Sequence, residues 1–238
     1  FGRISYDYAG KYLLEGSLRY DSSSVFPKSN KGGTFPAVSA GWVISKEDFW
    51  NYDGAVDYLK LRASWGQNGS DANLAGNGDI QVFRTVDGST PVVYQGITGV
   101  TPGNLANPSL TWERSEQTNI GVDLRALNGR LNFGADWYNK TTRDLIIPNG
   151  NIIAPPSLGQ TVGAINGGTI KNTGLEFEIG WGDTTSGDFS YDINLNISTL
   201  KNEVTEVIVP APLIGAGSPS NGDGITRFEE GYPVWYFY

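Results

Sequence analysis

The chain has 238 residues, of which 39% are hydrophobic and 12% aromatic, enough apolar surface for a folded unit rather than a disordered chain. It contains no Cys and no His, which excludes disulfides and thiolate nucleophiles and removes the side chain best suited to proton transfer near neutral pH. The formal net charge of −8 argues against a nucleic-acid surface, which needs clustered Lys and Arg. We therefore expect no catalytic residue, no metal site, no cofactor and no nucleic-acid partner.

No stretch of the sequence approaches the roughly eighteen consecutive apolar residues that a transmembrane helix needs. The strands of a membrane β-barrel escape that test, because every second residue along them is polar. The chain has no Met and begins at Phe1 inside an alternating segment, so we expect it to be an internal part of a longer protein.

Alternation of apolar and polar residues predicts an all-β fold with eight strands and the start of a ninth. Several segments reach the roughly nine to eleven residues with which a tilted strand crosses a bilayer, whereas strands of globular proteins average about five or six. The predicted strands are, in chain order, Arg3–Tyr8, Tyr12–Asp21, Thr34–Ile44, Tyr58–Gln67, Thr111–Leu127, Leu131–Ile147, Gly174–Gly182 and Phe189–Lys201, with Val234–Tyr238 beginning another.

The links between these strands alternate between short and long. Ala9–Lys11, Asn128–Gly129 and Asp183–Asp188 are compact, whereas Ser22–Gly33, Asn68–Leu110, Pro148–Thr173 and Asn202–Gly231 are long and polar. Transmembrane β-barrels show this asymmetry, with short periplasmic turns on one rim and long extracellular loops on the other. The link Ser45–Asp57 is longer than its place predicts, and its Phe49, Trp50 and Tyr52 indicate a short helical turn at a membrane surface.

Each strand divides into an apolar and a polar face, because successive side chains point to opposite sides. In Tyr12–Asp21 the two faces are Tyr12, Leu14, Gly16, Leu18 and Tyr20 against Leu13, Glu15, Ser17, Arg19 and Asp21. A barrel would turn the apolar face to lipid and the polar face to an interior channel. A soluble sandwich alternates in the same way, so a secreted carbohydrate-binding module and a β-sandwich glycoside hydrolase remain alternatives.

Aromatic residues of the apolar face gather near both ends of the strands, as expected for belts at two membrane interfaces. The predicted interface residues are Tyr8, Tyr12, Trp42, Trp181, Phe189 and Tyr191 near the compact turns, and Tyr20, Trp65 and Trp137 toward the long links. Trp112 has the position of a belt residue as well.

Two acidic patterns suggest chemistry but have simpler explanations. Glu176 and Glu178 lie two residues apart on one strand face, close to the spacing of a glycosidase pair, but lining of a channel is the favoured interpretation. Asp71, Asn73, Asn77 and Asp79 suggest calcium, yet Ala75 and Val82 occupy positions where an EF-hand loop needs ligands. We expect a solvated polar loop there.

An ordered series of short motifs resembles the SusC/RagA-type TonB-dependent transporters of the outer membrane. The motifs are YAGKYLL at Tyr8–Leu14, YDSSSVF at Tyr20–Phe26, GTFPAVSAGW at Gly33–Trp42, LKLRASWG at Leu59–Gly66, NPSLTWE at Asn107–Glu113, QTNIGVD at Gln117–Asp123, WYNKTTRDL at Trp137–Leu145 and NTGLE at Asn172–Glu176. Each motif is weak alone, but the series covers most of the chain and lapses only in the long links.

The resemblance implies a large plugged barrel, of the roughly 22-stranded kind, in the outer membrane of a Gram-negative bacterium of the Bacteroidetes type. Residues 1–238 would be part of that barrel domain, with the plug and the N-terminal regions elsewhere. The resemblance also implies import of glycans or peptides with energy supplied through TonB, and a SusD-like surface lipoprotein as lid over the long-link rim.

Substrate contact is expected from the long links and from the polar face near them. Sugars stack their C–H faces on aromatic rings and need several hydrogen-bond partners, so the candidate contact residues are Arg84, Tyr94, Trp112, Glu113 and Gln117.

Overall fold

The computed structural model describes residues 1–50, 54–72, 74, 83–84, 86–87, 90–91, 93–99, 101–102, 104–148, 161–184, 187, 189–208, 213–214 and 226–237. Apart from one 3₁₀-helix, η1 (Ile44–Lys46), all the regular structure in these ranges is β. None of the helical structure in these ranges is long and apolar enough to cross a membrane.

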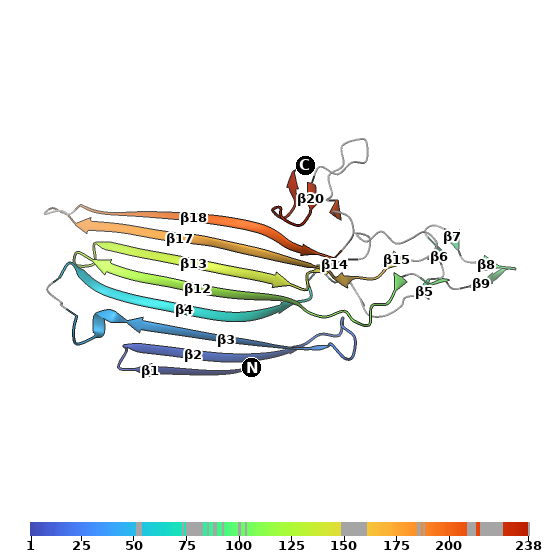
Figure 1. The fold of residues 1–238 in the computed structure, drawn as a ribbon, viewed down its shortest axis with the longest axis horizontal. Helices are drawn as coiled ribbons and strands as arrows, with labels where there is room; N and C mark the ends of the chain where they lie inside the picture. The colour runs from blue at the N-terminus through green and yellow to red at the C-terminus, as the bar shows by residue number, and fades with distance from the viewer. Residues whose placement is uncertain are drawn as a thin grey trace.

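Eight strands form one antiparallel sheet in which each strand pairs with the next long strand of the chain (Figure 1). The strands are β1 (Gly2–Tyr8), β2 (Tyr12–Ser22), β3 (Gly32–Val43), β4 (Val56–Ser70), β12 (Glu113–Ala126), β13 (Leu131–Arg143), β17 (Gly168–Thr184) and β18 (Ser190–Val207). The prediction of eight antiparallel strands is confirmed, and the short helical turn predicted after β3 is present as η1. Residues 51–53, which include Tyr52 of that link, lie outside the described ranges.

Three boundaries differ from the prediction by more than three residues. β13 ends at Arg143 because Asp144 takes a positive φ of 56°, so Ile146–Ile147 leaves the sheet and forms β14. β17 begins six residues earlier than predicted, at Gly168, and β18 continues to Val207. Most of the added residues are polar, and the apolar Ile170 and Val204 stand on the parity of the polar face, so alternation did not mark them.

Beyond the sheet there are short strands of two or three residues, and apart from β14 and β21 they lie in the long links, where the sequence predicted no strand. They are β5 (Phe83–Arg84), β6 (Val86–Asp87), β7 (Thr90–Pro91), β8 (Val93–Tyr94), β9 (Ile97–Thr98), β10 (Thr101–Pro102), β11 (Asn104–Leu105), β14 (Ile146–Ile147), β15 (Thr161–Val162), β16 (Ile165–Asn166), β19 (Leu213–Ile214), β20 (Thr226–Phe228) and β21 (Tyr236–Phe237). The predicted final strand is present as β21, but it pairs with β20 in a small sheet rather than extending the wall beside β18.

The compact turns need left-handed backbone, which explains their residues. Between β1 and β2, Ala9 and Gly10 have φ of 54° and 62°, as the two central residues of a type I′ turn do, and Lys11 N–H donates to the Tyr8 carbonyl. Asp7 Oδ1 also accepts from the Gly10 N–H at 2.6 Å. The turn is therefore fixed by backbone and side chain together.

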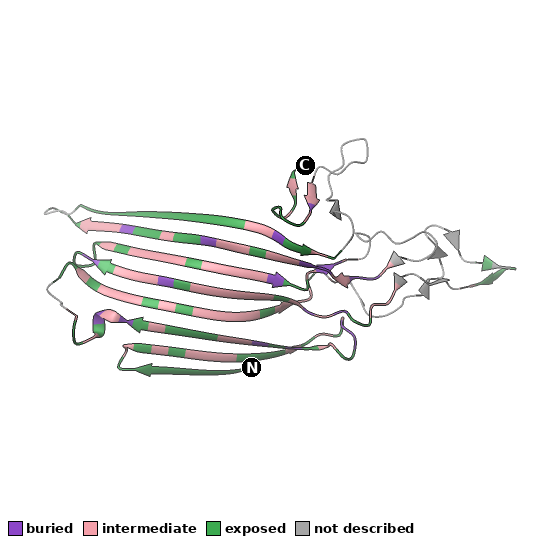
Figure 2. Cartoon of the chain, viewed as in Figure 1, coloured by how far each residue is buried: buried purple, intermediate pink, exposed green. Residues whose placement is uncertain are grey.

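The two faces of the sheet differ as alternation predicts, and within the described residues no second layer of protein covers the apolar one (Figure 2). Large apolar side chains on that face are exposed, among them Ile4 (79%), Leu14 (53%), Val38 (54%), Ile120 (54%) and Ile193 (61%). A soluble sandwich would bury this face. The single-layered wall of a barrel leaves it for another apolar medium.

The wall splits at its long-link end between β3 and β4. Their ladder stops at the pair Ala37–Gly66, while β3 continues beside β2 to Gly32 and β4 continues beside β12 to Ser70. The ring of Phe35 lies beside this opening, since a Cβ built on Gly69 would be 2.0 Å from Phe35 Cζ. Glycine at position 69 therefore leaves room for the ring.

The two buried hydrophobic clusters of the described residues lie at this long-link end, and only Phe35 and Val204 of their members belong to the eight-stranded sheet. One cluster consists of Phe26, Phe35, Leu110, Trp112, Ile146 and Ala164, and a second of Ile147, Val204 and Phe228. The first cluster brings residues of three different links together. The second joins β14 and β20 to the end of β18, where Tyr232 and Gly231 make backbone hydrogen bonds with Val204.

Candidate functional site: the polar face and the long-link rim

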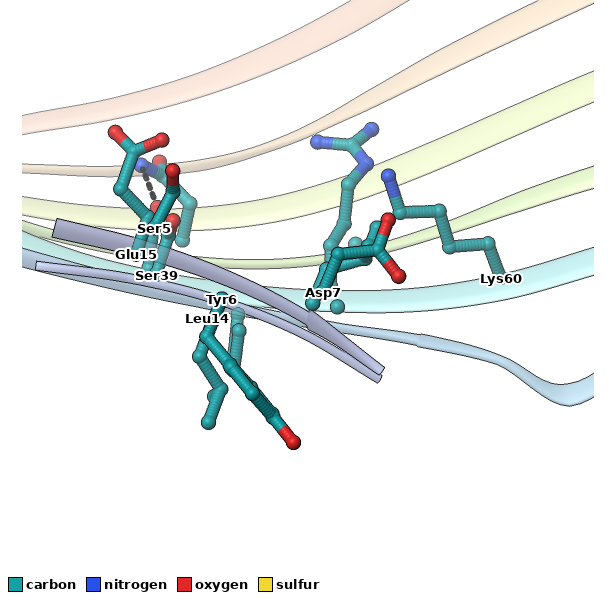
Figure 3. A pocket seen from close by; sticks show the side chains of 15 residues that line it. Ser5, Tyr6, Asp7, Leu14, Glu15, Ser39 and Lys60 are labelled. Atoms are coloured by element: carbon teal, nitrogen blue, oxygen red, sulfur yellow. Dashed lines mark hydrogen bonds between the residues drawn. The ribbon is translucent and has the colours of Figure 1, made fainter. Parts of the chain in front are cut away.

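The polar face is organised in rows that cross the strands, because paired residues of an antiparallel sheet point to the same side. One row runs Ser5, Glu15, Ser39, Ser64, Asn119 and Tyr138, and the next runs Asp7, Leu13, Gly41, Arg62, Gly121, Asp136 and Glu176. Figure 3 shows Ser5, Asp7, Glu15, Ser39 and Lys60 on one side of the sheet and Tyr6 and Leu14 on the other. The wall thus presents a continuous hydrogen-bonding surface.

Arg62 of β4 is the electrostatic centre of this face. Its Nε donates to both carboxylate oxygens of Asp123, at 3.1 and 3.2 Å, and its Nη2 donates to Asp136 Oδ2 at 2.6 Å. Asp136 lies on β13, two strands away, and Gly121 of β12 occupies the position between them. A Cβ on Gly121 would meet Asp136 Oδ1 at 2.4 Å, so the missing side chain is what allows the bridge.

A second side chain also lies flat over a glycine. A Cβ on Gly174 would be 2.6 Å from the hydroxyl of Tyr138, whose ring crosses from β13 towards β17. Gln117 donates from Nε2 to Asn119 Oδ1 at 2.8 Å, and Asn119 donates to Ser64 Oγ at 3.2 Å. These groups line a groove of about 340 Å³ that also includes Lys140 and Glu176. Such a surface can donate to and accept from a polar ligand.

The acidic pairs considered from the sequence lie in different places. Glu176 and Glu178 both belong to β17, on the polar face, opposite Asp136 and Gly134. They line a groove of about 430 Å³ together with Arg62, Asp123 and Asp136. Asp71 accepts a hydrogen bond from Ser23 Oγ at 2.7 Å. Asn73, Asn77 and Asp79 lie outside the described residues.

The rim above the polar face is built around Trp112. Its ring is 5% exposed, with centroids 4.8 Å from Phe26 and 5.6 Å from Phe35, and its indole N–H donates to the Lys31 carbonyl. These contacts join the link after β2 to the segment before β12. Trp112 therefore supports the rim and has little ring surface left for stacking on a ligand.

Asn166 joins the same rim to the link after β13. Its Oδ1 accepts from the Thr111 N–H, and its Nδ2 donates to the carbonyls of Thr111 and Asp144, all at 2.8 Å. The side-chain amide of Asn166 thus hydrogen-bonds with both the N–H and the carbonyl of Thr111, as a neighbouring strand would. The sequence reasoning missed Asn166, and a lone Asn in a polar link gives no signal.

The remaining predicted contact residues have different surroundings. Glu113 accepts from the Ile146 N–H at 3.2 Å at the start of β12, and Gln117 lies in the groove described above. Arg84 and Tyr94 have backbone in β5 and β8, but their side chains lie outside the described part of the chain. Ligand contact by these residues stays a prediction.

Glu47, which the sequence reasoning also missed, gathers the aromatic residues at the compact-turn end. Its Oε1 accepts from the Tyr12 hydroxyl at 2.6 Å and from the Trp42 indole N–H at 2.9 Å, and its Oε2 lies 3.3 Å from Lys11 Nζ. The pKa of Glu47 is lowered because Tyr12 and then Trp42 donate to the charged carboxylate, with Lys11 adding to both. The aromatic tips thus have a shared polar partner beyond the strand ends.

The other predicted interface residues also lie on the apolar face. Tyr8 stacks on Tyr12 at 6.3 Å, Phe189 stacks on Tyr191 at 6.1 Å, and the Trp181 N–H donates to the Tyr191 hydroxyl at 3.3 Å. Tyr20 is 66% exposed near the long-link end, and the Trp65 N–H donates to Glu116 Oε1 at 3.0 Å. Trp137 lies at the middle of β13, paired with Ile120 and Leu175, farther from the rim than the sequence suggested.

Comparison with known proteins agrees with this arrangement. Residues 1–224 match the model of the TonB dependent receptor-like, beta-barrel family. TonB-dependent receptor P39 of Formosa agariphila is 36% identical over 208 residues, which are 87% of this chain and 19% of that protein. TonB-dependent receptor SusC of Bacteroides thetaiotaomicron is 32% identical over 212 residues, 87% of this chain and 20% of that protein.

A solved structure shows the same fold. The RagAB peptide importer in its closed-closed state superimposes with a TM-score of 0.81 at 23% identity, over 98% of this chain and 24% of the RagAB chain. The chain therefore spans about a fifth of the length of the curated relatives it matches. It belongs to the TonB-dependent receptor β-barrel family of the outer membrane, within which it is similar to SusC.

Proposed function

We propose that this chain forms about eight strands of the barrel wall, and part of the extracellular vestibule, of an outer-membrane importer driven through TonB. The observation that carries the proposal is the single-layered wall, whose exposed apolar face suits lipid and whose opposite face carries the rows around Arg62 and Asn119. No catalytic step is assigned to these residues. The plug that would open and close the channel is expected elsewhere in the complete protein.

The cargo we propose is a glycan or a peptide. The similarity to SusC and to the RagAB peptide importer supports this choice. The polar face suits either class, because hydroxyls and amides both need closely spaced donors and acceptors such as Gln117, Asn119 and Tyr138. Gln117 and Glu113 are the contact residues that we retain from the sequence, with Trp112 holding the rim on which the vestibule stands.

The partners follow from the same similarity. We propose TonB, acting on the plug side of the complete protein, and a SusD-like surface lipoprotein as lid over the long-link rim. The rim is suited to such a lid because the Phe26–Trp112 cluster and Asn166 hold three links together as one surface. Neither alternative, the soluble binding module or the sandwich hydrolase, accounts for the uncovered apolar face.

The test uses the complete protein that carries this chain, in its own host. Deletion of its gene is expected to abolish growth on one class of polymer, glycan or peptide, while growth on the corresponding monomers is unchanged. Gln117→Leu is expected to slow that growth, whereas Gln67→Leu, the same change on the apolar parity of β4, is expected to leave it unchanged. Recovery of the complete protein in the aqueous phase without detergent would overturn the importer.

A further inference from the structure

The apolar face has a hollow over β3 and β4. Ala40 and Ala63 are direct cross-strand partners and both are exposed, while the neighbours in the same row are the larger Leu14 on β2 and Ile120 on β12. Two adjoining grooves of about 560 and 550 Å³ share these four residues. Their lining is almost wholly apolar, so the hollow has the chemistry of a site for a hydrocarbon chain.

Two aromatic side chains at the compact-turn end of the hollow indicate its depth in the membrane. Trp42 and Tyr12 line the groove there, and their polar atoms reach Glu47 beyond the strand ends. Amphipathic rings take this position at the boundary between hydrocarbon and headgroups. The segment that follows β3 therefore lies at the level of the lipid headgroups of the periplasmic leaflet.

That segment and the turn between β1 and β2 together hold two cations and two anions, Lys11 and Lys46 with Glu47 and Asp48. The amino group of Lys46 lies over Gly10, where a Cβ would be 2.3 Å away, and Lys46 has no ion pair among the described residues. The side chain of Asp48 is fully exposed, although its Oδ1 lies 3.0 Å from Lys11 Nζ. Phe49 next to it is 71% exposed.

We propose that the hollow and the Lys46–Phe49 segment bind one phospholipid with a zwitterionic ethanolamine headgroup, drawn from the periplasmic leaflet. An acyl chain fills the hollow over Ala40 and Ala63, the phosphate approaches Lys46 and the ammonium approaches Asp48. The charge pattern selects this headgroup, because two cations and two anions leave no net charge at the site, which suits a zwitterion better than an anionic lipid. The site is independent of which cargo the importer carries.

The experiment measures which lipids the complete protein retains. The protein is reconstituted in nanodiscs with equal amounts of phosphatidylethanolamine and phosphatidylglycerol, extracted in mild detergent, and its co-purified lipids are quantified by mass spectrometry. Ala63→Leu fills the hollow and is expected to lower retained phosphatidylethanolamine about tenfold, since an acyl chain loses its apolar contact. Lys46→Gln is expected to lower it about threefold, as loss of one exposed ionic contact does.

Each variant has a matched control. Ala135→Leu makes the same change on the apolar face, between Val122 and Phe177 and outside the hollow, and is expected to retain lipid as the unmodified protein does. Lys28→Gln removes an exposed lysine at the long-link end and is expected to be neutral. Equal retention in Ala63→Leu and Ala135→Leu, or enrichment of phosphatidylglycerol instead, would overturn the proposal. So would the finding that a second copy of the protein covers the hollow, seen as a dimer that Ala63→Leu converts to a monomer.

A measurement on the unmodified protein covers the case in which a variant does not insert. Native mass spectrometry with stepwise activation is expected to leave one phosphatidylethanolamine bound after the others have dissociated. A smooth loss of all lipids with no preferred last one would contradict the site.

Discussion

The guanidinium of Arg62 donates to Asp136 across the place where Gly121 lacks a side chain, over a separation of two strands and at 2.6 Å. The same guanidinium is held by Asp123 on the intervening strand. Three strands of the wall are thus tied on the channel side by one cation. Because the ion pairs are only partly shielded from solvent, we expect each to contribute modestly.

Gly121→Ala tests this bridge. The new Cβ would be 2.4 Å from Asp136 Oδ1 and 2.9 Å from Arg62 Cζ, so the pair must move apart, and we expect a loss of about 1 kcal/mol in the free energy of unfolding. Heat-modifiable migration and thermal unfolding of the complete protein in detergent measure it. Gly134→Ala is the control, because its Cβ would approach Glu178 Cβ only to 3.8 Å and the loss of glycine in a strand is expected to be neutral or stabilising.

Trp112→Ala tests the rim cluster. Loss of the ring leaves a cavity beside Phe26 and Phe35, which we expect to cost about 3 kcal/mol of local stability. Limited proteolysis is expected to cut the link after β2 faster, with Trp112→Phe restoring part of the protection. Trp181→Ala, the same change at the compact-turn end, serves as control. Unchanged cleavage of the link in Trp112→Ala would show that the cluster does not hold it.

Asn166→Ala tests the amide that binds Thr111. Removing its three hydrogen bonds leaves both backbone groups of Thr111 without this partner, and we expect the Thr111 amide hydrogen to exchange about tenfold faster or more, equivalent to about 1.4 kcal/mol. Hydrogen exchange measured by mass spectrometry over the segment before β12 reads this out. Asn196→Ala, which alters an exposed amide on the polar face, is expected to leave that segment unchanged.

Glu47→Gln tests, through the pH dependence of stability, the cluster that Glu47 forms with Tyr12, Trp42 and Lys11 at the compact-turn end. The pKa of Glu47 is lowered in the folded protein, so its carboxylate stabilises the fold above the ordinary value of 4.5, and this contribution is lost as the pH falls through the lowered pKa. The melting temperature of the unmodified protein should exceed that of Glu47→Gln near pH 7. The difference should shrink below pH 4.5, and a constant difference across this range would contradict the role of the charge.

Lys11 belongs to the same cluster, and its pKa shifts in the opposite direction. The pKa of Lys11 is raised because Asp48 and then Glu47 accept hydrogen bonds from its ammonium group. Its contribution is complete below the ordinary pKa of 10.5 and is lost as the pH rises through the raised value. Lys11→Gln is therefore expected to lower the melting temperature at neutral pH and to have little further effect at strongly alkaline pH, as a titration of both proteins would measure.

Alternation was enough to predict the wall, because side chains on a β-strand that separates lipid from water must alternate. It failed at the long-link ends of β17 and β18, because Ile170 and Val204 there pack in the second buried cluster from the polar parity of their strands. Ile146 was assigned to a strand of the wall, although it belongs to the buried cluster around Trp112. Its hydrophobicity indicates that it is buried but does not indicate which neighbours bury it. The positive φ of Asp144, which separates the strand from this cluster, has no clear mark in the sequence.

The site was harder to predict than the wall for a related reason. Trp112 was chosen as an aromatic residue near a rim, and nothing local distinguishes a ring that stacks on a ligand from one that packs on Phe26. Glu47 and Asn166 act through partners up to 55 residues away in sequence, which only the folded chain brings near. Gly121 is informative only once its neighbours across two strands are known.

The opening between β3 and β4 marks the boundary between the strands of the wall and the long links. Phe35 and Trp112 close this opening at the base of the long links. The parts of those links farther from the strands can therefore lengthen or change composition without disturbing the hydrogen-bonded strands. Related barrels can then differ in their loop tips while the strands and the rim cluster beneath stay the same.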